Sequence, residues 1–500
     1  MSTTTPTCSL SIHNINPHVK AAKYAVRGEL ATRAEEYRVR LTQSSEKRPP
    51  TPPDEKSPLP FKDVIFANIG NPQQLDQKPI TFFRQVLSLL ENPHLLENSE
   101  ALTSIFNYPP DVISRAQKLL AEVHSIGAYS VSQGVPFIRQ TVANFLKERD
   151  GYPSAPHDIY LTAGASSGVN TLMNVICASS STGVLVPIPQ YPLYTATLSV
   201  LNARCVPYYL DESNSWSTSI SDIKSSLAEA KKSGTDVRAM VIINPGNPTG
   251  ASLSPEDMKS AFDIAAEERL VVMADEVYQT NVFAPAKWTS FKKVLRDLQS
   301  DSSNSGKFDN IELVSFHSTS KGMVGECGHR GGYFELVGFD PEVAAQINKF
   351  VSIQLCPPVV AQCLVDLMVN PPRNGSQSYD LYKKEYDTIY YGLESRAKAL
   401  HKVFTSLPNI ECQDPQGAMY LFPTIRIPPK ACEAATKEGR KPDEFYCLRM
   451  LEGTGICTVP GSGFGQKDGT WHFRTTFLPG GTEWVERISK FHRKFMEEYK

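Results

Sequence analysis

The sequence predicts an α/β protein built around a large, mainly parallel β-sheet, and two observations support this fold class. First, four short apolar runs at residues 184–186, 239–243, 270–274 and 311–316 are rich in β-branched residues and lack the alternation of a half-exposed strand. Such runs are typical of strands that are buried on both faces. Second, helical patterns separate these runs between about residues 110 and 335, as expected when helices connect parallel strands.

The length and the apolar spacing predict three parts. A chain of 500 residues is too long for one ordinary core. Apolar residues from Val19 to Leu41 recur every three or four positions, which predicts one helix or two consecutive helices. A proline-rich stretch at residues 48–54 then predicts an extended linker. We therefore assign residues 1–60 to an N-terminal helical arm and linker, 61–375 to a large domain, and 376–500 to a smaller α+β domain, to which 61–110 partly contribute.

Composition and charge exclude several classes of partner. The chain has 51 basic and 53 acidic residues, so we expect neither nucleic acid nor an anionic membrane as a partner. No apolar run reaches the roughly 18–20 residues that cross a bilayer. Residues 1–17 contain no Lys or Arg, which favours a cytoplasmic location over a mitochondrial one. The ten cysteines form no CxxC pair, and we expect no metal site.

The run Ser315-Phe-His-Ser-Thr-Ser-Lys-Gly322 contains the first candidate catalytic residue, Lys321. It follows an apolar strand pattern and precedes Arg330 by nine residues. A lysine between hydroxyl side chains and glycine suits covalent binding of the aldehyde of pyridoxal 5'-phosphate, and nearby serine and arginine side chains suit its phosphate. A solvent-exposed surface lysine is the alternative.

Polar residues also follow the other predicted strands. The run at 184–186 is followed by Tyr191, the run at 239–243 by Asn247, and the run at 270–274 by Asp275 and Tyr278. Because ligands bind at the carboxyl ends of the strands in parallel α/β sheets, these four clusters are predicted to meet in one crevice.

These motifs resemble the fold-type I, aspartate-aminotransferase-like family of pyridoxal phosphate transferases, and within it the alanine aminotransferases. The resemblance runs from about residue 13 to the C-terminus. Its most specific pieces are Tyr24-Ala-Val-Arg-Gly-Glu29, Pro79-Ile-Thr-Phe-Phe-Arg-Gln-Val86, Ser318-Thr-Ser-Lys-Gly322 and Arg330-Gly-Gly-Tyr333. The chain departs from the family at Ala163, Met323 and His329, which leaves the substrate range open.

The resemblance implies a role for each residue around the cofactor ring. Lys321 would bind the aldehyde and move the substrate proton, and Asp275 would hold the pyridinium nitrogen in its protonated form. Tyr278 and Asn247 would bind the ring's 3-oxygen, although Asn247 also suits a simple turn. Tyr191 would stack on the ring, unless it is a packed core residue.

The resemblance also implies where the anionic groups bind. The phosphate would lie against Gly164, Ala165 and Ser166, at a strand-to-helix turn, and against three further side chains: Ser318, Ser320 and Arg330. Gly70 and Arg474 would bind the substrate carboxylate, with a structural salt bridge as the alternative for Arg474. Tyr129 would reach the phosphate of a neighbouring subunit, which implies a homodimer with shared sites; local packing in its loop is the alternative.

The implied reaction is transfer of an amino group from L-alanine to 2-oxoglutarate, giving pyruvate and L-glutamate by ping-pong kinetics. Two alternatives stay open from the sequence. One is another transaminase of the same fold, acting on glyoxylate or on kynurenine and aromatic amino acids, or a related lyase. The other is a catalytically silent domain, which the presence of Lys321, Asp275, Asn247 and Arg474 disfavours.

Overall fold

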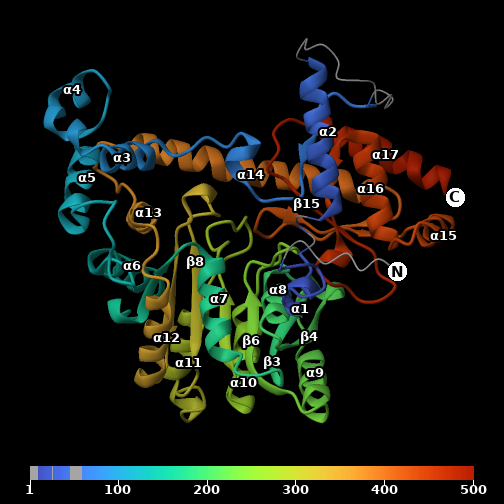
Figure 1. Ribbon diagram of the computed structural model, residues 1–500, viewed down its shortest axis with the longest axis horizontal. Coiled ribbons are helices and arrows are strands. Elements are labelled where there is room, and N and C mark those ends of the chain that lie inside the picture. The colour runs from blue at the N-terminus through green and yellow to red at the C-terminus, as the bar shows by residue number, and fades with distance from the viewer. Residues whose placement is uncertain (1–8, 25, 27, 46–58) are drawn as a thin grey trace.

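The computed structural model describes residues 9–24, 26, 28–45 and 59–500. The predicted proline-rich linker at 48–54 lies outside these residues. Figure 1 shows the large sheet with its helices in one half of the molecule and the C-terminal helices in the other, with the long helix α14 (Tyr379–Thr405) running above the sheet and into the C-terminal helices. No helix in the described ranges has an apolar stretch that could cross a bilayer.

An eight-stranded sheet forms the centre of the large half, in the order β2-β9-β8-β7-β6-β3-β4-β5. The pairs from β8 through β7, β6 and β3 to β4 are parallel, whereas β9 and β5 pair antiparallel with their neighbours. The prediction of a mainly parallel sheet is therefore confirmed. The strands are β2 (Ile159–Thr162), β3 (Thr182–Ile188), β4 (Arg204–Asp211), β5 (Ser217–Thr218), β6 (Asp236–Ile243), β7 (Val271–Asp275), β8 (Leu313–Ser318) and β9 (Gly332–Val337).

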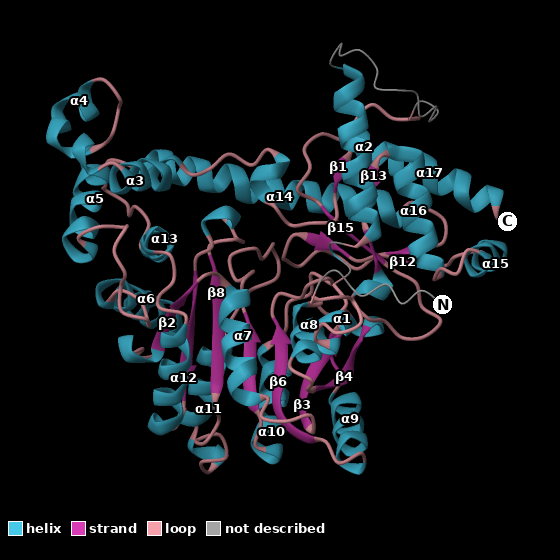
Figure 2. Cartoon of the chain, in the orientation of Figure 1, coloured by secondary structure: helices cyan, strands magenta, loops and turns pink. Residues whose placement is uncertain are grey.

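Helices cover both faces of this sheet, which explains the unbroken apolar runs of its strands (Figure 2). On one face, α9 (Ile220–Lys232), α10 (Pro255–Glu268) and α11 (Phe291–Ser300) pack in one hydrophobic cluster with β4, β6 and β7. On the other face, α7 (Ala165–Ile176), α8 (Leu193–Val200) and α12 (Pro341–Ile353) pack in a second cluster. Helix α10 begins at a capping box, in which Ser254 and Asp257 satisfy each other's backbone N–H groups.

A third cluster lies beside β2 and joins helices from distant parts of the chain. Its members come from α3 (Thr81–Glu91), α5 (Pro110–Val123), α6 (Pro136–Asp150) and α13 (Val359–Val369), with α4 (Ser99–Ser104) adding Leu102. Apolar residues at three- and four-residue spacing make these helices amphipathic, so they bury one face together.

The C-terminal part has its own core and short strands. Strand β15 (Phe473–Thr476) lies between β11 (Tyr420–Leu421) and β14 (Val459–Pro460), and β10 (Ile410–Glu411) pairs with β12 (Thr424–Ile425). Strand β1 (Ile65–Phe66) pairs with β13 (Ile456–Cys457), so the segment after residue 60 joins this part. Helices α14, α15 (Pro429–Lys437), α16 (Pro442–Thr454) and α17 (Glu483–Glu498) surround the strands. The domain boundaries at residues 60 and 375 stay a prediction.

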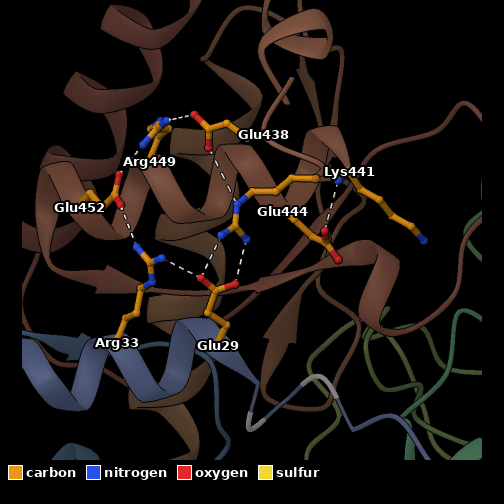
Figure 3. A network of polar contacts seen from close by, with 8 residues as sticks. Glu29, Arg33, Glu438, Lys441, Glu444, Arg449 and Glu452 are labelled. Carbon is orange, nitrogen blue, oxygen red and sulfur yellow. Dashed lines mark hydrogen bonds and ion pairs between the residues drawn. The ribbon is translucent and has the colours of Figure 1, made fainter. Parts of the chain in front are cut away.

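The N-terminal segment forms two helices, α1 (Pro17–Ala21) and α2 (Glu29–Ser45). Ion pairs tie α2 to the C-terminal part (Figure 3). Glu29 accepts hydrogen bonds from both terminal nitrogens of Arg440, at 2.8 and 2.9 Å. Arg33 pairs with Glu29 at 2.8 Å and with Glu452 of α16 at 3.2 Å. This network fixes the end of the arm that leads to Tyr24 and Val26, two residues of the cavity described below.

Candidate active site

The strand register brings the predicted residues together. Ile243 of β6 pairs with Asp275 of β7, and Asp275 pairs with Phe316 of β8, so the three strands end at one level. The chain beyond these ends lines a cavity of about 580 Å³. Every predicted site residue except Gly164 and Tyr129 forms part of its wall. The predicted convergence of the four strand ends is therefore what the structure shows.

Lys321 lies in the loop after β8, and its amine points to Gly70. Lys321 Nζ donates a hydrogen bond to the Gly70 carbonyl oxygen at 3.0 Å. The next residue must be glycine, because Gly322 has φ +65° and a β-carbon there would lie 2.4 Å from Thr280 Oγ1. The loop therefore fixes the lysine backbone while it leaves the amine free to reach the cavity.

Asp275 presents a buried carboxylate at the end of β7, with 6% of the residue exposed. Its Oδ2 accepts a hydrogen bond from the Tyr194 hydroxyl at 2.7 Å. Burial raises the pKa of Asp275, and the hydrogen bonds from Tyr194 and the Val277 backbone together with the charge of Lys321 partly offset this effect. A buried carboxylate with a neutral hydroxyl partner suits a cationic ligand group.

Arg474 is a buried guanidinium, 1% exposed, held by neutral groups. Its Nη1 donates to Asn247 Oδ1 at 2.9 Å and its Nη2 donates to the Asn68 carbonyl oxygen. Among the described residues, Arg474 Nε has no hydrogen-bond partner. The guanidinium lies between two rings, 4.0 Å from the centroid of Tyr420 and 4.6 Å from that of Phe464. A buried cation with neutral partners and an unused donor fits an anionic substrate group.

A second anion site lies where β2 turns into α7. Gly164 precedes the helix with φ +91°, so the first N–H groups of α7 are open to a ligand. A β-carbon at Gly164 would lie 2.5 Å from Arg330 Nη2, which brings this turn and Arg330 together. Arg330 donates to three neutral oxygens: Ser320 Oγ at 3.1 Å, the Cys327 carbonyl at 3.0 Å and the Ala163 carbonyl at 3.2 Å. A helix N-terminus beside a cation held by neutral groups is suited to a phosphate.

The remaining predicted residues lie as follows. Asn247 Nδ2 is 3.5 Å from the Tyr278 hydroxyl, so both reach the same wall of the cavity. The Tyr191 hydroxyl is hydrogen-bonded to that of Tyr24, and their rings meet edge to face at 6.0 Å. Ser318 Oγ lies 3.0 Å from the Ser320 backbone nitrogen, from which it accepts a hydrogen bond. These positions agree with the expected ring contacts, and the individual roles stay predictions.

Tyr129 is separate from this cavity. It is 80% exposed in the single chain. Its predicted contact with a neighbouring subunit's phosphate therefore stays untested.

The sequence reasoning missed Tyr194, Asn68 and Tyr420. Tyr194 lies in the first turn of α8, three residues after Tyr191, and this closeness to a predicted residue was the signal that the sequence offered. Asn68 acts through its backbone carbonyl, which any residue could supply. Tyr420 lies on β11 and lines the cavity, although it is far in sequence from every predicted residue except Arg474.

Pyridoxal 5'-phosphate fits these groups. The cofactor carries an aldehyde, a ring nitrogen that binds a proton, and a phosphate. The cavity offers an amine at Lys321, a buried carboxylate at Asp275 that accepts from a neutral hydroxyl, and the anion site at α7 and Arg330. Each group of the cofactor thus has a partner: a nucleophilic amine for the aldehyde, and a group of complementary charge for the ring nitrogen and for the phosphate.

Comparisons with known proteins agree with this chemistry. The family model "Aminotransferase class I and II" matches residues 97–485. An alanine aminotransferase, mitochondrial, from Saccharomyces cerevisiae is 51% identical over 99% of this chain and 82% of its own length. A second protein of that yeast, 49% identical over 99% of this chain and 96% of its own, is named an inactive alanine aminotransferase. A solved alanine aminotransferase from Pyrococcus furiosus matches with a TM-score of 0.70 and 25% identity, over 97% of this chain and 99% of its own.

The same comparisons correct one prediction. The cytoplasmic location expected from residues 1–17 is wrong, because the yeast relative at 51% identity and relatives from Dictyostelium discoideum and Arabidopsis thaliana, 48% and 45% identical, are named mitochondrial. The prediction depended on the charge of a short N-terminal stretch alone, and that stretch carries little information about destination.

Proposed function

The chain is a transaminase of the class I and II aminotransferase family, and we propose that it exchanges the amino group between L-alanine and 2-oxoglutarate, giving pyruvate and L-glutamate, with pyridoxal 5'-phosphate as its cofactor. The names of the relatives support the choice of substrates. Because one relative at 49% identity is named inactive, overall similarity does not decide turnover, and the proposal depends on the side chains of the cavity.

The observation that carries the proposal is the set of charges in this one cavity. The Lys321 amine and the Arg474 guanidinium are both held by neutral oxygens, and both share the cavity with the buried carboxylate of Asp275. An α-amino acid needs a cation for its carboxylate, and the bound cofactor needs an amine and an anion. The three side chains supply these groups, and Arg330 in the same cavity supplies a cation for the phosphate.

When bound, pyridoxal phosphate supplies an aldehyde that links to amines and a cationic ring that withdraws electrons from the α-carbon of the substrate. Lys321 holds the aldehyde at rest, and its amine then moves the proton at the α-carbon of the amino acid. Asp275 holds the proton on the ring nitrogen, and Tyr278 and Asn247 bind the 3-oxygen. Arg330 and the N-terminus of α7 bind the phosphate.

The substrate is positioned by groups on the C-terminal part of the chain and on its N-terminal segment. Arg474 binds the α-carboxylate through its fork of donors, and its buried Nε has no hydrogen-bond partner among the described residues. Gly70 would lie beside this carboxylate, and its carbonyl oxygen accepts the hydrogen bond of Lys321. Tyr24 and Val26 line the same cavity.

The proposal includes a homodimer in which Tyr129 of one subunit reaches the phosphate site of the other. The exposure of Tyr129, at 80%, and of its neighbour Val131, at 56%, supports a second copy over this surface. Mixing a Lys321→Ala chain with a Tyr129→Ala chain should restore activity in mixed dimers, because one of their two sites is then complete. A mixture no more active than its components would overturn the shared site.

The function is tested by purified protein supplied with pyridoxal phosphate, L-alanine and 2-oxoglutarate, with pyruvate as the product measured. The wild type should form pyruvate, and Lys321→Ala should lose at least about 1,000-fold in kcat, within the range of acid–base and covalent catalysis. Lys349→Ala, at an exposed position of α12, is the matched control. Aromatic or glyoxylate transamination without use of alanine would overturn the substrate choice, and a Lys321→Ala protein with normal turnover would overturn the site.

A further inference from the structure

Tyr420 is a cavity residue whose hydroxyl has no role in the reaction as described above. It lies on β11, is 2% exposed and pairs through its backbone with Thr476 of β15. We propose that the Tyr420 hydroxyl is a positioning group for Lys321, which holds the lysine amine beside the substrate whenever that amine is not bound to the cofactor. This inference rests on the proposed transamination, in which Lys321 alternates between a bound and a free state.

The geometry around Gly70 places the two groups together. A β-carbon at Gly70 would lie 2.2 Å from the Tyr420 hydroxyl oxygen and 3.3 Å from Lys321 Nζ. The amine also donates to the Gly70 carbonyl at 3.0 Å. The hydroxyl, the amine and the Gly70 backbone therefore occupy one small space, and only a residue without a side chain can lie between the first two.

The surroundings make this hydroxyl a good acceptor for an ammonium group. Burial raises the pKa of Tyr420, but the charges of Lys321 and Arg474 and a hydrogen bond from Tyr278 outweigh it, and the pKa is lowered overall. The Tyr278 hydroxyl donates to the Tyr420 oxygen at 3.5 Å. The titratable and charged groups that face Tyr420 are Lys321 and Cys327 after β8, Tyr278 after β7, Tyr191 after β3, and Arg474 on β15.

A purely structural role would need the ring alone. The Tyr420 ring stacks on the Arg474 guanidinium at 4.0 Å, and a phenylalanine ring would do the same. The hydroxyl contributes nothing to this stack. Replacement of Tyr420 by Phe therefore separates the two roles, since it removes the hydroxyl from the space beside the amine and keeps the support of Arg474.

The first measurement uses Tyr420→Phe with pyridoxal phosphate bound. We expect kcat with L-alanine to fall about tenfold, the size of one lost hydrogen bond to a charged group, while KM for L-alanine changes less than twofold because Arg474 stays supported. We also expect the alkaline limb of the plot of kcat against pH to lie at a different pH in the variant. Tyr446→Phe is the matched control, because it removes a buried hydroxyl of the same core that contacts His492 at 2.9 Å, away from the cavity.

The second measurement does not depend on turnover. Cofactor-free protein is treated with acetic anhydride at several pH values, and acetylation of the peptide that contains Lys321 is followed by mass spectrometry. Tyr420→Phe should acetylate at lower pH than the wild type, because its ammonium group has lost an acceptor. Equal acetylation curves together with an unchanged kcat profile would overturn the role of Tyr420, even if the wild type is an active transaminase. A wild type that forms no pyruvate would instead overturn the proposed function.

A second variant covers the case in which Tyr420→Phe fails to fold, as judged by its thermal midpoint. Gly70→Ala inserts a methyl group between the hydroxyl and the amine, so it should change Lys321 acetylation in the same direction. If Tyr420→Phe does fold, the double variant should lose no more kcat than Gly70→Ala alone, because both changes remove one interaction. Two outcomes would contradict the inference. One is a double variant whose loss in kcat equals the product of the two single losses. The other is a Gly70→Ala protein with the acetylation curve of the wild type.

Discussion

The hydroxyl of Tyr194 donates a 2.7 Å hydrogen bond to the carboxylate of Asp275, across 81 positions of the sequence. Tyr194 lies in the first turn of α8 and is fully buried, and Asp275 ends the central strand β7. The bond holds a buried carboxylate in place and partly offsets the effect of burial on its pKa. Tyr194 thus orients the group that is proposed to bind the ring nitrogen of the cofactor.

Tyr194→Phe should therefore weaken the binding of pyridoxal phosphate by about tenfold, or about 1.4 kcal/mol. Without the hydroxyl, the pKa of Asp275 rises further and its carboxylate is a poorer partner for a cation. Titration of the cofactor-free protein with pyridoxal phosphate, followed by absorbance, measures the affinity. Tyr208→Phe is the control, because Tyr208 is equally buried and donates to the Val241 carbonyl at 2.8 Å, away from the cavity. Equal affinities of the two variants would contradict the role of Tyr194.

Arg474→Lys should separate charge from geometry at the substrate site. Lysine keeps the positive charge but cannot supply the planar pair of donors, so kcat/KM for L-alanine should fall about 100-fold, or about 2.7 kcal/mol. Most of the change should appear in KM. Arg396→Lys is the control, since Arg396 is partly buried in the C-terminal part and donates to the Phe477 carbonyl at 3.0 Å. If kcat/KM falls by the same factor in Arg474→Lys and Arg396→Lys, the effect comes from general packing and not from the substrate site.

Glu326 should stabilise the loop that carries Lys321 and Arg330, in a pH-dependent way. Its carboxylate, 2% exposed, accepts from Arg84 at 2.7 and 2.9 Å. Burial raises the pKa of Glu326, but hydrogen bonds from His329 and Arg84 outweigh it and hold the pKa below its usual 4.5. Because the folded-state pKa is lowered, this stabilisation is complete above about pH 4.5 and is lost as the pH falls through the folded-state value.

The measurement is the free energy of unfolding of Glu326→Gln and wild type as a function of pH. At neutral pH the variant should be less stable by about 1–2 kcal/mol, the lower end for bonds to charged groups, since Arg84 is 44% exposed. The difference should shrink below about pH 4.5. Glu97→Gln, at an exposed pair with His94, should change stability by less than about 0.5 kcal/mol. If the difference in the free energy of unfolding between Glu326→Gln and wild type grows at low pH, the predicted direction of the pH dependence is wrong.

The ion pairs between α2 and the C-terminal part should hold the arm locally. Glu29 is 45% exposed and Arg440 is 22% exposed, so Glu29→Gln should lower the global stability by less than about 1 kcal/mol. Hydrogen exchange of residues 29–45 should nevertheless become faster, most clearly at low salt. Glu35→Gln is the matched control, because its pair with Arg38 lies within α2. Equal exchange in both variants would mean that the contacts with Arg440 do not anchor the helix.

The fold and half of the site were predictable for a local reason. A parallel strand that is buried on both faces is mostly apolar, and polar residues that meet a ligand gather at its carboxyl end. The positions of Asp275, Asn247 and Lys321 after such runs therefore indicated both the sheet and the crevice. Arg474 and Gly70 lacked this signal and were assigned through the family resemblance alone. The charge of residues 1–17, by contrast, predicted the wrong location.

By itself, the sequence determined where four buried strands of the sheet lie, to within a few residues, and which polar residues follow them, because apolar runs and the polar residues after them are properties of short segments. Only the tertiary structure decided which side chains meet there. The hydroxyl of Tyr420 reaches the space beside Lys321 because the C-terminal part packs against the large sheet, and the carbonyl of Asn68 binds Arg474 because segments 406 positions apart meet within the C-terminal part. Contacts of this kind depend on how elements that are distant in sequence are placed relative to one another. No local sequence pattern encodes this relative placement.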